Sequence, residues 1–229
     1  GDSVYKWDGA TWSALGSFPV QSIDTLGVFD DGGGPVLLAS GSNSLKKWNG
    51  SSWSSIGTVT GISSGYHVNA LASYDHGGGP RLFAGGNFEV VDGTGAANVA
   101  RLDASSWSAL GGGLNEGVRV VSVLDTGSGA ELYVGGEFTS AGGAVASSIA
   151  RWDGSSWSTF GEGLPGSVLA LAAFDTGSGP ELYAGGTSTT RRLARWNGSS
   201  WSPVGGGMDG NVLALAVHDD GNGQALYVG

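Results

Sequence analysis

The sequence predicts an all-β fold, a five-bladed β-propeller with four-stranded antiparallel blades. Three observations predict it: a repeat that occurs five times, four strand-like segments in each repeat, and no glycine-free segment with the apolar spacing of an amphipathic helix. Four-stranded repeats of 40–54 residues are typical of propellers. A linear β-solenoid is the alternative, but solenoid repeats are shorter and need distinct caps.

The repeat is marked by a hairpin that carries two aromatic positions. It reads RWDGSSWS at 151–158, and similar segments lie at 6–13, 47–54, 101–108 and 195–202. The second tryptophans are separated by 41, 54, 50 and 44 residues, and they are Trp12, Trp53, Trp107, Trp157 and Trp201.

Each repeat contains four predicted strands, most clearly in the fourth copy. The apolar run VLALAAFD at 168–175 has strand length, and the Gly- and Pro-rich TGSGP that follows predicts a turn. A second strand, ELYAGG, covers 181–186. The third and fourth strands, 192–198 and 199–205, are joined through Asn-Gly, a strong hairpin signal. The small residues of the first strand suit the innermost position of a blade.

The two tryptophans of one hairpin are expected on the same face of the sheet. A two-residue turn at Asp153-Gly154 would place Trp152 opposite Ser155, and a four-residue turn would place it opposite Trp157. Both registers give the same result, because side chains alternate and cross-strand partners share a face. Burial of the indoles against a neighbouring repeat would contribute several kcal/mol, at about 25 cal/mol per Å².

The fifth repeat is divided between the two ends of the sequence. The segment ALYVG ends at Gly229, one glycine short of the GG in the other copies, and Gly1 would supply the second. We expect one domain over 1–229 with blades near 20–57, 67–111, 117–161 and 167–205, and a fifth blade made from 211–229 with 1–16. This two-plus-two closure predicts termini within about 10 Å of each other, and it suggests a chain excised from a longer array.

Composition excludes several classes of function. The formal net charge is −10 and only 13% of residues are charged, which argues against nucleic acid and anionic membranes as partners. No apolar run is long enough to cross a membrane. The chain has no cysteine, so disulfides, thiolate metal sites and a cysteine nucleophile are excluded. We expect a monomer with no cofactor and no metal, secreted or at a cell surface.

The repeat resembles the kelch repeat, in which a double glycine ends the second strand and a tryptophan lies in the fourth. It is most similar to repeats of the fungal cortical-marker-for-cell-polarity family and of bacterial, planctomycete-type surface proteins, and residues 135–163 match their pattern well. The resemblance covers the whole chain and implies a propeller, but it implies no specific function. The third hairpin departs from it with Leu102-Asp103-Ala104, and we expect a different turn there because a type I′ turn would need positive φ at Ala104. The copper chemistry of kelch-type galactose oxidases would need a cysteine, and the sialidase Asp-box spacing is not matched.

Two groups of residues raise the question of a metal site. His76 and His218 follow the first strands of different repeats and His67 precedes a first strand, so we expect no shared metal site and interpret all three as solvated loop residues. An Asp-Gly turn recurs in every repeat, at 30–35, 75–80, 125–130, 175–180 and 219–224. Calcium needs six to eight oxygen ligands, so a turn in which aspartate caps its own backbone is the preferred interpretation, with calcium kept as the alternative.

The loops between second and third strands differ in length while the opposite turns are nearly constant. Variable loops on a constant scaffold are where binding is usually found. The predicted function is therefore a non-catalytic extracellular module that recognises protein or glycan through these loops. No catalytic motif occurs. The alternatives are a carbohydrate-active hydrolase that uses carboxylates in the central funnel and an excised or engineered propeller without a specific ligand. The candidate contact residues are Tyr66, His67, Glu89, Asp92, Glu137, Thr139, Arg191 and Arg192.

Overall fold

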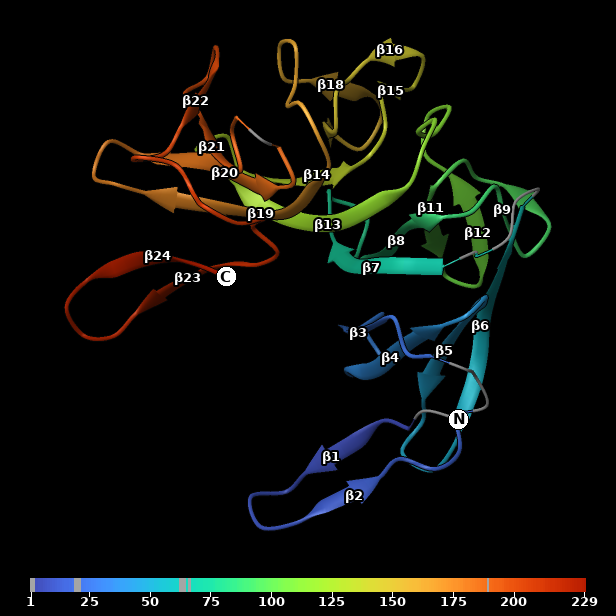
Figure 1. Ribbon diagram of the computed structural model, residues 1–229. Helices are drawn as coiled ribbons and strands as arrows, with labels where there is room; N and C mark the ends of the chain where they lie inside the picture. The colour runs from blue at the N-terminus through green and yellow to red at the C-terminus, as the bar shows by residue number, and fades with distance from the viewer. Residues whose placement is uncertain (1–2, 19–21, 62–64, 66, 189) are drawn as a thin grey trace. The chain divides into compact units, whose positions relative to one another are not determined.

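The computed structural model describes residues 3–18, 22–61, 65, 67–188 and 190–229. All regular secondary structure in these residues is β-strand (Figure 1). The chain divides into two compact units, Gly1–Leu110 and Gly111–Gly229.

The first unit contains three antiparallel sheets. A two-stranded sheet joins β1 (Tyr5–Trp7) and β2 (Trp12–Ala14). A six-stranded sheet has the order β10-β9-β6-β5-β4-β3, with β3 (Thr25–Phe29), β4 (Val36–Gly41), β5 (Ser44–Trp48), β6 (Trp53–Thr60), β9 (Val90–Val91) and β10 (Thr94–Gly95). A four-stranded sheet has the order β12-β11-β8-β7, with β7 (His67–Tyr74), β8 (Arg81–Asn87), β11 (Val99–Asp103) and β12 (Ser106–Ala109).

The second unit contains two four-stranded and two two-stranded sheets. The first four-stranded sheet comprises β13 (Val118–Asp125), β14 (Ala130–Gly136), β17 (Ile149–Trp152) and β18 (Trp157–Thr159), in that order. The second comprises β19 (Val168–Asp175), β20 (Pro180–Gly186), β21 (Leu193–Trp196) and β22 (Trp201–Pro203). The short hairpins are β15 (Ser140–Ala141) with β16 (Ala144–Val145), and β23 (Leu215–Asp219) with β24 (Gln224–Val228).

These sheets confirm that the protein is all-β and that three of its repeats form four-stranded antiparallel sheets. The predicted strand 168–175 has the same bounds as β19. The six-stranded sheet differs from the expected four strands because β6 is eight residues long, and its last residues, Val59 and Thr60, pair with β9. The variable loop 87–99 thereby contributes the hairpin β9–β10 to this sheet.

The tryptophan hairpins have a four-residue loop. Trp152 lies directly opposite Trp157, with ring centroids 5.1 Å apart, so the structure selects the second of the two registers considered. Asp153 Oδ1 accepts the backbone N–H groups of Ser155 and Ser156, both at 2.8 Å. These hydrogen bonds stabilise the charged form and lower the pKa of Asp153 well below its ordinary value.

The third hairpin, 101–108, has a different turn, as expected. The reason that we gave is wrong, because Ala104 does adopt a positive φ. Asp103 pairs with Ser106, which leaves a two-residue loop, and Ala104 adopts φ 53°. The Asp103 carboxylate accepts hydrogen bonds from Arg101 Nε at 2.9 Å and from Ser108 Oγ at 3.1 Å, and Arg81 also donates to it. These bonds hold the end of β11 against β12 and offset the cost of a left-handed alanine, about 1–2 kcal/mol.

The double glycine at the end of the second strand permits two close approaches. A Cβ on Gly185, the first glycine, would lie 2.3 Å from Val212 Cγ1 of the following repeat. A Cβ on Gly186, the second, would lie 1.9 Å from the carbonyl oxygen of Ser167, beside a register shift between β19 and β20. The first glycine therefore allows contact between repeats, and the second allows contact within one sheet.

The second tryptophan of a hairpin bonds to the preceding repeat. Trp53 Nε1 donates to Leu15 O at 2.7 Å, and Trp107 Nε1 donates to Ile56 O at 2.7 Å. In the second unit, Trp201 Nε1 donates to Phe160 O at 3.2 Å. In each case the acceptor is the third residue after the second tryptophan of the repeat before. We refer to this contact as the inter-repeat hydrogen bond.

Candidate functional site

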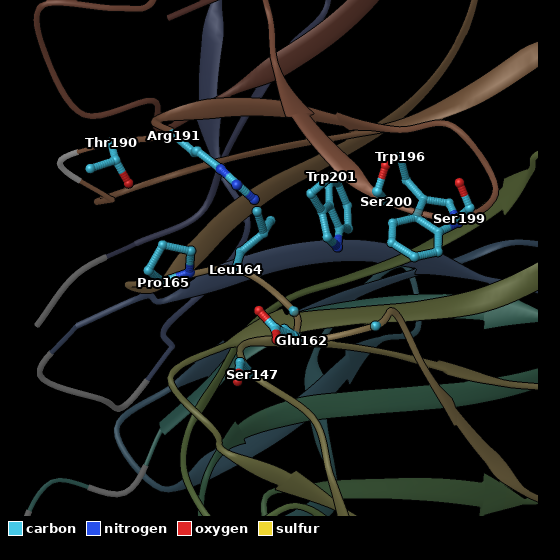
Figure 2. A pocket seen from close by; sticks show the side chains of 12 residues that line it. Ser147, Glu162, Leu164, Pro165, Thr190, Arg191, Trp196, Ser199, Ser200 and Trp201 are labelled. Atoms are coloured by element: carbon cyan, nitrogen blue, oxygen red, sulfur yellow. The ribbon is translucent and has the colours of Figure 1, made fainter.

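The cavity that we consider the candidate site lies in the second unit and is lined by the hairpin β21–β22 and by residues of three loops (Figure 2). Its volume is about 610 Å³, within the usual range of ligand pockets. The residues that line it are Ser147, Gly161, Glu162, Gly163, Leu164, Pro165, Thr190, Arg191, Trp196, Ser199, Ser200 and Trp201. We refer to it as the indole cavity.

The hairpin supplies an aromatic wall with hydroxyl groups beside it. Trp196 lies opposite Trp201, with ring centroids 5.5 Å apart and planes at 54°. Asn197 Oδ1 accepts the backbone N–H groups of Ser199 and Ser200 at 3.0 and 2.9 Å, and this fixes the loop that carries both serines. Trp201 is 7% exposed and serves the core, whereas Trp196 is partly exposed. Trp196 therefore offers apolar ring surface to a ligand.

The loop at 161–165 supplies a second wall. Leu164 N donates to Ser147 O at 2.9 Å, and Gly163 N donates to Phe160 O at 2.9 Å. Gly163 has φ 73°, and a Cβ there would lie 2.2 Å from Ser147 O, so only glycine fits. The backbone bonds and the glycine hold this loop in one conformation beside the hairpin.

Two charged side chains of opposite sign line the indole cavity. Within the ranges that the structure describes, neither Glu162 nor Arg191 forms an ion pair. The backbone N–H of Arg191 donates to Ser188 Oγ at 3.1 Å, which anchors the chain beside the cavity. The cavity therefore combines an indole surface, hydroxyl groups, one hydrogen-bond-accepting carboxylate and one hydrogen-bond-donating guanidinium.

Of the predicted contact residues, Arg191 lines this cavity. Glu137 and Thr139 are used for structure: the Glu137 carboxylate pairs with Arg119 at 2.8 Å, and Thr139 Oγ1 accepts from Asn115 Nδ2 at 2.9 Å. Arg192 Nη1 donates to Met208 O at 2.7 Å.

The remaining predicted contacts lie in the first unit. His67 Nδ1 lies 2.9 Å from Asp24 Oδ2, and Asp92 Oδ1 accepts the Thr58 N–H at 2.8 Å. The backbone of Glu89 bonds Thr60 and Ala96. Tyr66 lies outside the described residues. His67, Glu89 and Asp92 are not among the described residues that line the indole cavity.

The sequence missed Trp196 and Glu162 as candidate contacts. The sequence predicts a core position for Trp196, because tryptophan stands at this hairpin position in four of the five repeats, and Glu162 lies after the fourth strand, where no catalytic or binding motif occurs. Comparison of the repeats could have singled out residue 162, because glutamate stands there while the neighbouring repeats have glycine, Gly112 and Gly206, at the corresponding positions.

In the Asp-Gly turns, the aspartate side chain caps the backbone of its own turn, which is the interpretation that we preferred over calcium binding. Asp175 Oδ1 accepts the N–H groups of Gly177 and Gly179, and Asp30, Asp75, Asp125 and Asp219 bond their own turns in the same way. The described residues contain no group of three or more metal-ligating side chains. They also contain no helix long and apolar enough to span a membrane.

Comparison with known proteins identifies the fold. No protein-family model matches the sequence, and no curated protein matches it. The chain is structurally similar to BBS1N in the crystal structure of BBS1N in complex with ARL6DN, soaked with mercury, with a TM-score of 0.57 and 14% sequence identity. The match covers 95% of this chain and 64% of that one. Since BBS1N is a propeller and the sheets described above are four-stranded and antiparallel, this chain has a β-propeller-like fold.

Proposed function

We propose that this protein is a non-catalytic extracellular binding module that recognises a glycan in the indole cavity. The proposal rests on two charged residues of the indole cavity, Glu162 and Arg191, which form no ion pair with any residue that the structure describes, and on the partly exposed Trp196 beside them. A sugar ring has an apolar face that can stack on an indole and a rim of hydroxyl groups that both donate and accept hydrogen bonds. One carboxylate and one guanidinium match both roles of such hydroxyl groups.

The same cavity gives a reason to favour binding over glycoside hydrolysis. Glycosidases use two carboxyl groups that flank the scissile bond, about 5–10 Å apart. Glu162 is the only acidic residue among the described residues that line the cavity. A single carboxylate can accept hydrogen bonds from a sugar but does not form such a pair.

The expected result is binding of one or more glycans on an array, with affinity lost when the indole cavity is changed. Trp196→Ala and Arg191→Ala should each weaken binding by at least about tenfold, since a stacking or charge-assisted contact contributes about 1.5–3 kcal/mol. Calorimetric titration with the best array hit measures the change.

Arg119→Ala is the matched control for Arg191→Ala. Arg119 pairs with Glu137, the first residue of the variable loop 137–149, and is not among the described residues that line the indole cavity. Its replacement should leave glycan affinity unchanged. No hit on the array, or equal losses for Arg119→Ala and Arg191→Ala, would contradict the proposal.

We also propose the finer architecture: a monomeric, kelch-like propeller of five blades, the fifth formed by β23–β24 together with β1–β2. The repeat pattern supports this, because Leu182 pairs with Trp196 and Ala184 with Ala194 in the fourth repeat. By the same register, Leu226 would pair with Trp7 and Val228 with Tyr5. In the described residues, each of these hairpins forms a sheet of two strands.

The exposed apolar side chains support the same proposal. Nine large hydrophobic residues are exposed in the described part of the chain, and all except Val145 belong to segments that a fifth blade would cover. They are Tyr5, Trp7 and Trp12 in β1–β2, Leu26 and Val28 in β3, and Leu213, Tyr227 and Val228 in or next to β23–β24. Burial of this surface would stabilise the closed blade.

A cysteine pair tests the closure, since the chain has no native cysteine. Tyr5→Cys with Val228→Cys should form a disulfide within one chain on oxidation, because directly opposite residues have Cβ atoms about 4.5–5.5 Å apart. Tyr5→Cys with Gln224→Cys is the control, displaced by four residues or about 13 Å along the strand. Disulfide-linked dimers on a non-reducing gel, or equal crosslinking of both pairs, would refute the five-bladed closure.

A further inference from the structure

The third strand of the repeat carries a basic residue that is paired with an acid in three repeats. Arg151 Nη1 lies 2.9 Å from Glu131 Oε2, and Arg195 Nη1 lies 3.1 Å from Glu181 Oε2. In the remaining case, Arg101 Nη2 lies 2.9 Å from Asp103 Oδ2. The acid comes either from the second strand, as Glu131 and Glu181 do, or from the end of the third strand, as Asp103 does.

Lys47 occupies the same position in β5, but it lacks both acids. It lies opposite Leu38, as Arg151 lies opposite Tyr133. Val36 stands where the other repeats have Glu131 or Glu181, and Asn49 stands where Asp103 is found. Lys47 forms no ion pair with any residue that the structure describes.

Lys47 also lines a cavity of about 440 Å³ within the first unit. The apolar part of its lining comes from Phe29, Val36, Leu38, Ile56 and Leu102. Leu38 and Val36 replace the tyrosine and the glutamate of the second-unit repeats, so the change that removes the acid also makes this cavity more apolar. The result is one exposed ammonium group beside an apolar surface.

Two carboxylates limit which anion can enter. Asp31 and Asp92 line the cavity, and one oxygen of each accepts a backbone N–H, from Gly33 at 3.1 Å and from Thr58 at 2.8 Å. Their negative charge disfavours a multiply charged anion such as a phosphate ester, because like charges in a partly desolvated site repel. A ligand with a single negative charge fits better.

Two non-glycine residues that line this cavity have a backbone conformation in the left-handed region. Ala104 and Asp92 have φ values of 53° and 44°, and both line this cavity. Non-glycine residues in this conformation cluster at ligand sites, where the surrounding structure maintains the strain.

We propose that this cavity binds an amphipathic monocarboxylate, with its carboxylate on Lys47 and its apolar chain or ring against Phe29, Ile56 and Leu102. The carboxylate of the ligand takes the place of the acidic side chain that pairs with the basic residue in three other repeats. The site is independent of the indole cavity, which lies in the other unit, so either proposal can fail without the other.

Titration of the full chain with sodium octanoate, followed by calorimetry and by NMR of labelled protein, tests the proposal. We expect saturable one-to-one binding with shifts at Phe29 and Ile56. Lys47→Met should weaken binding at least about tenfold, while Lys47→Arg retains it, because a charge-assisted hydrogen bond is lost only in the first. Lys46→Met, one residue away on the opposite face of β5, is the matched control and should change nothing.

Two further measurements do not depend on Lys47→Met folding. Val36→Glu restores the acid of the other repeats and should abolish octanoate binding, and octan-1-ol and octyl phosphate should bind more weakly than octanoate. Equal binding of octan-1-ol, unchanged affinity in Val36→Glu, or an equal loss in Lys46→Met would overturn the proposal.

Discussion

Replacing Gly186 by alanine is expected to destabilise the protein by about 3 kcal/mol or more, the upper range for overpacking. The added Cβ would lie 1.9 Å from the carbonyl oxygen of Ser167, which is backbone and cannot rotate away. That carbonyl accepts the N–H of Thr187 at 3.0 Å, so relief of the clash would break a hydrogen bond. Thermal unfolding should show a melting temperature lower by about 6–12 °C.

Gly210→Ala is the control for this substitution. A Cβ on Gly210 would meet no atom within 4 Å, and its φ is not in the left-handed region. Its effect should stay within about 0.5 kcal/mol. Gly86 and Gly136 stand at the same repeat position, with carbonyl oxygens at 2.0 and 2.2 Å, and their replacement should repeat the loss. A melting temperature of Gly186→Ala equal to that of Gly210→Ala would contradict the prediction.

Replacing Trp107 by alanine should cost about 3–5 kcal/mol of stability. The side chain is 6% exposed and packs in a core cluster with Leu102 and Val91. It also makes the inter-repeat hydrogen bond to Ile56 O at 2.7 Å. Trp107→Phe retains much of the burial but removes the bond, and should cost about 1–2 kcal/mol. Urea unfolding of both variants separates the two contributions.

Val145→Ala provides the reference for these measurements, since Val145 is 76% exposed and its truncation should have almost no effect. Equal stability of Trp107→Phe and the unmodified protein would show that the inter-repeat hydrogen bond contributes nothing.

A strand could be predicted from the sequence where its own residues form a continuous apolar run that ends at a turn. The run at 168–175 is continuous, apolar and bounded by a turn, and it is β19. The hairpin β9–β10 could not be predicted, because two-residue strands carry no periodicity and their pairing with β6 depends on the length of that strand. The positive φ of Ala104 depends on side chains that meet at Asp103 from two strands, which local turn preferences cannot show.

The candidate site was less predictable than the fold. Loop variability selected Arg191, which lines the indole cavity, and it also selected Glu137, whose partner Arg119 is 18 residues away in the sequence. Whether a polar loop residue binds a ligand or its own scaffold depends on such distant partners. Trp196 was assigned to the core because the periodicity of a strand shows which face a residue occupies, but not where that face ends.

The inter-repeat hydrogen bond has a consequence for how such a chain can change in length. The repeat that contains Trp53 donates from this tryptophan and accepts at the carbonyl of Ile56, three residues later. A duplicated or deleted whole repeat therefore brings or removes one donor and one acceptor together, and leaves no unmatched group at the new junction. Duplication of a whole repeat would lengthen the array, and deletion of one would shorten it, without any compensating substitution. Recombination at other boundaries would separate a donor from its acceptor.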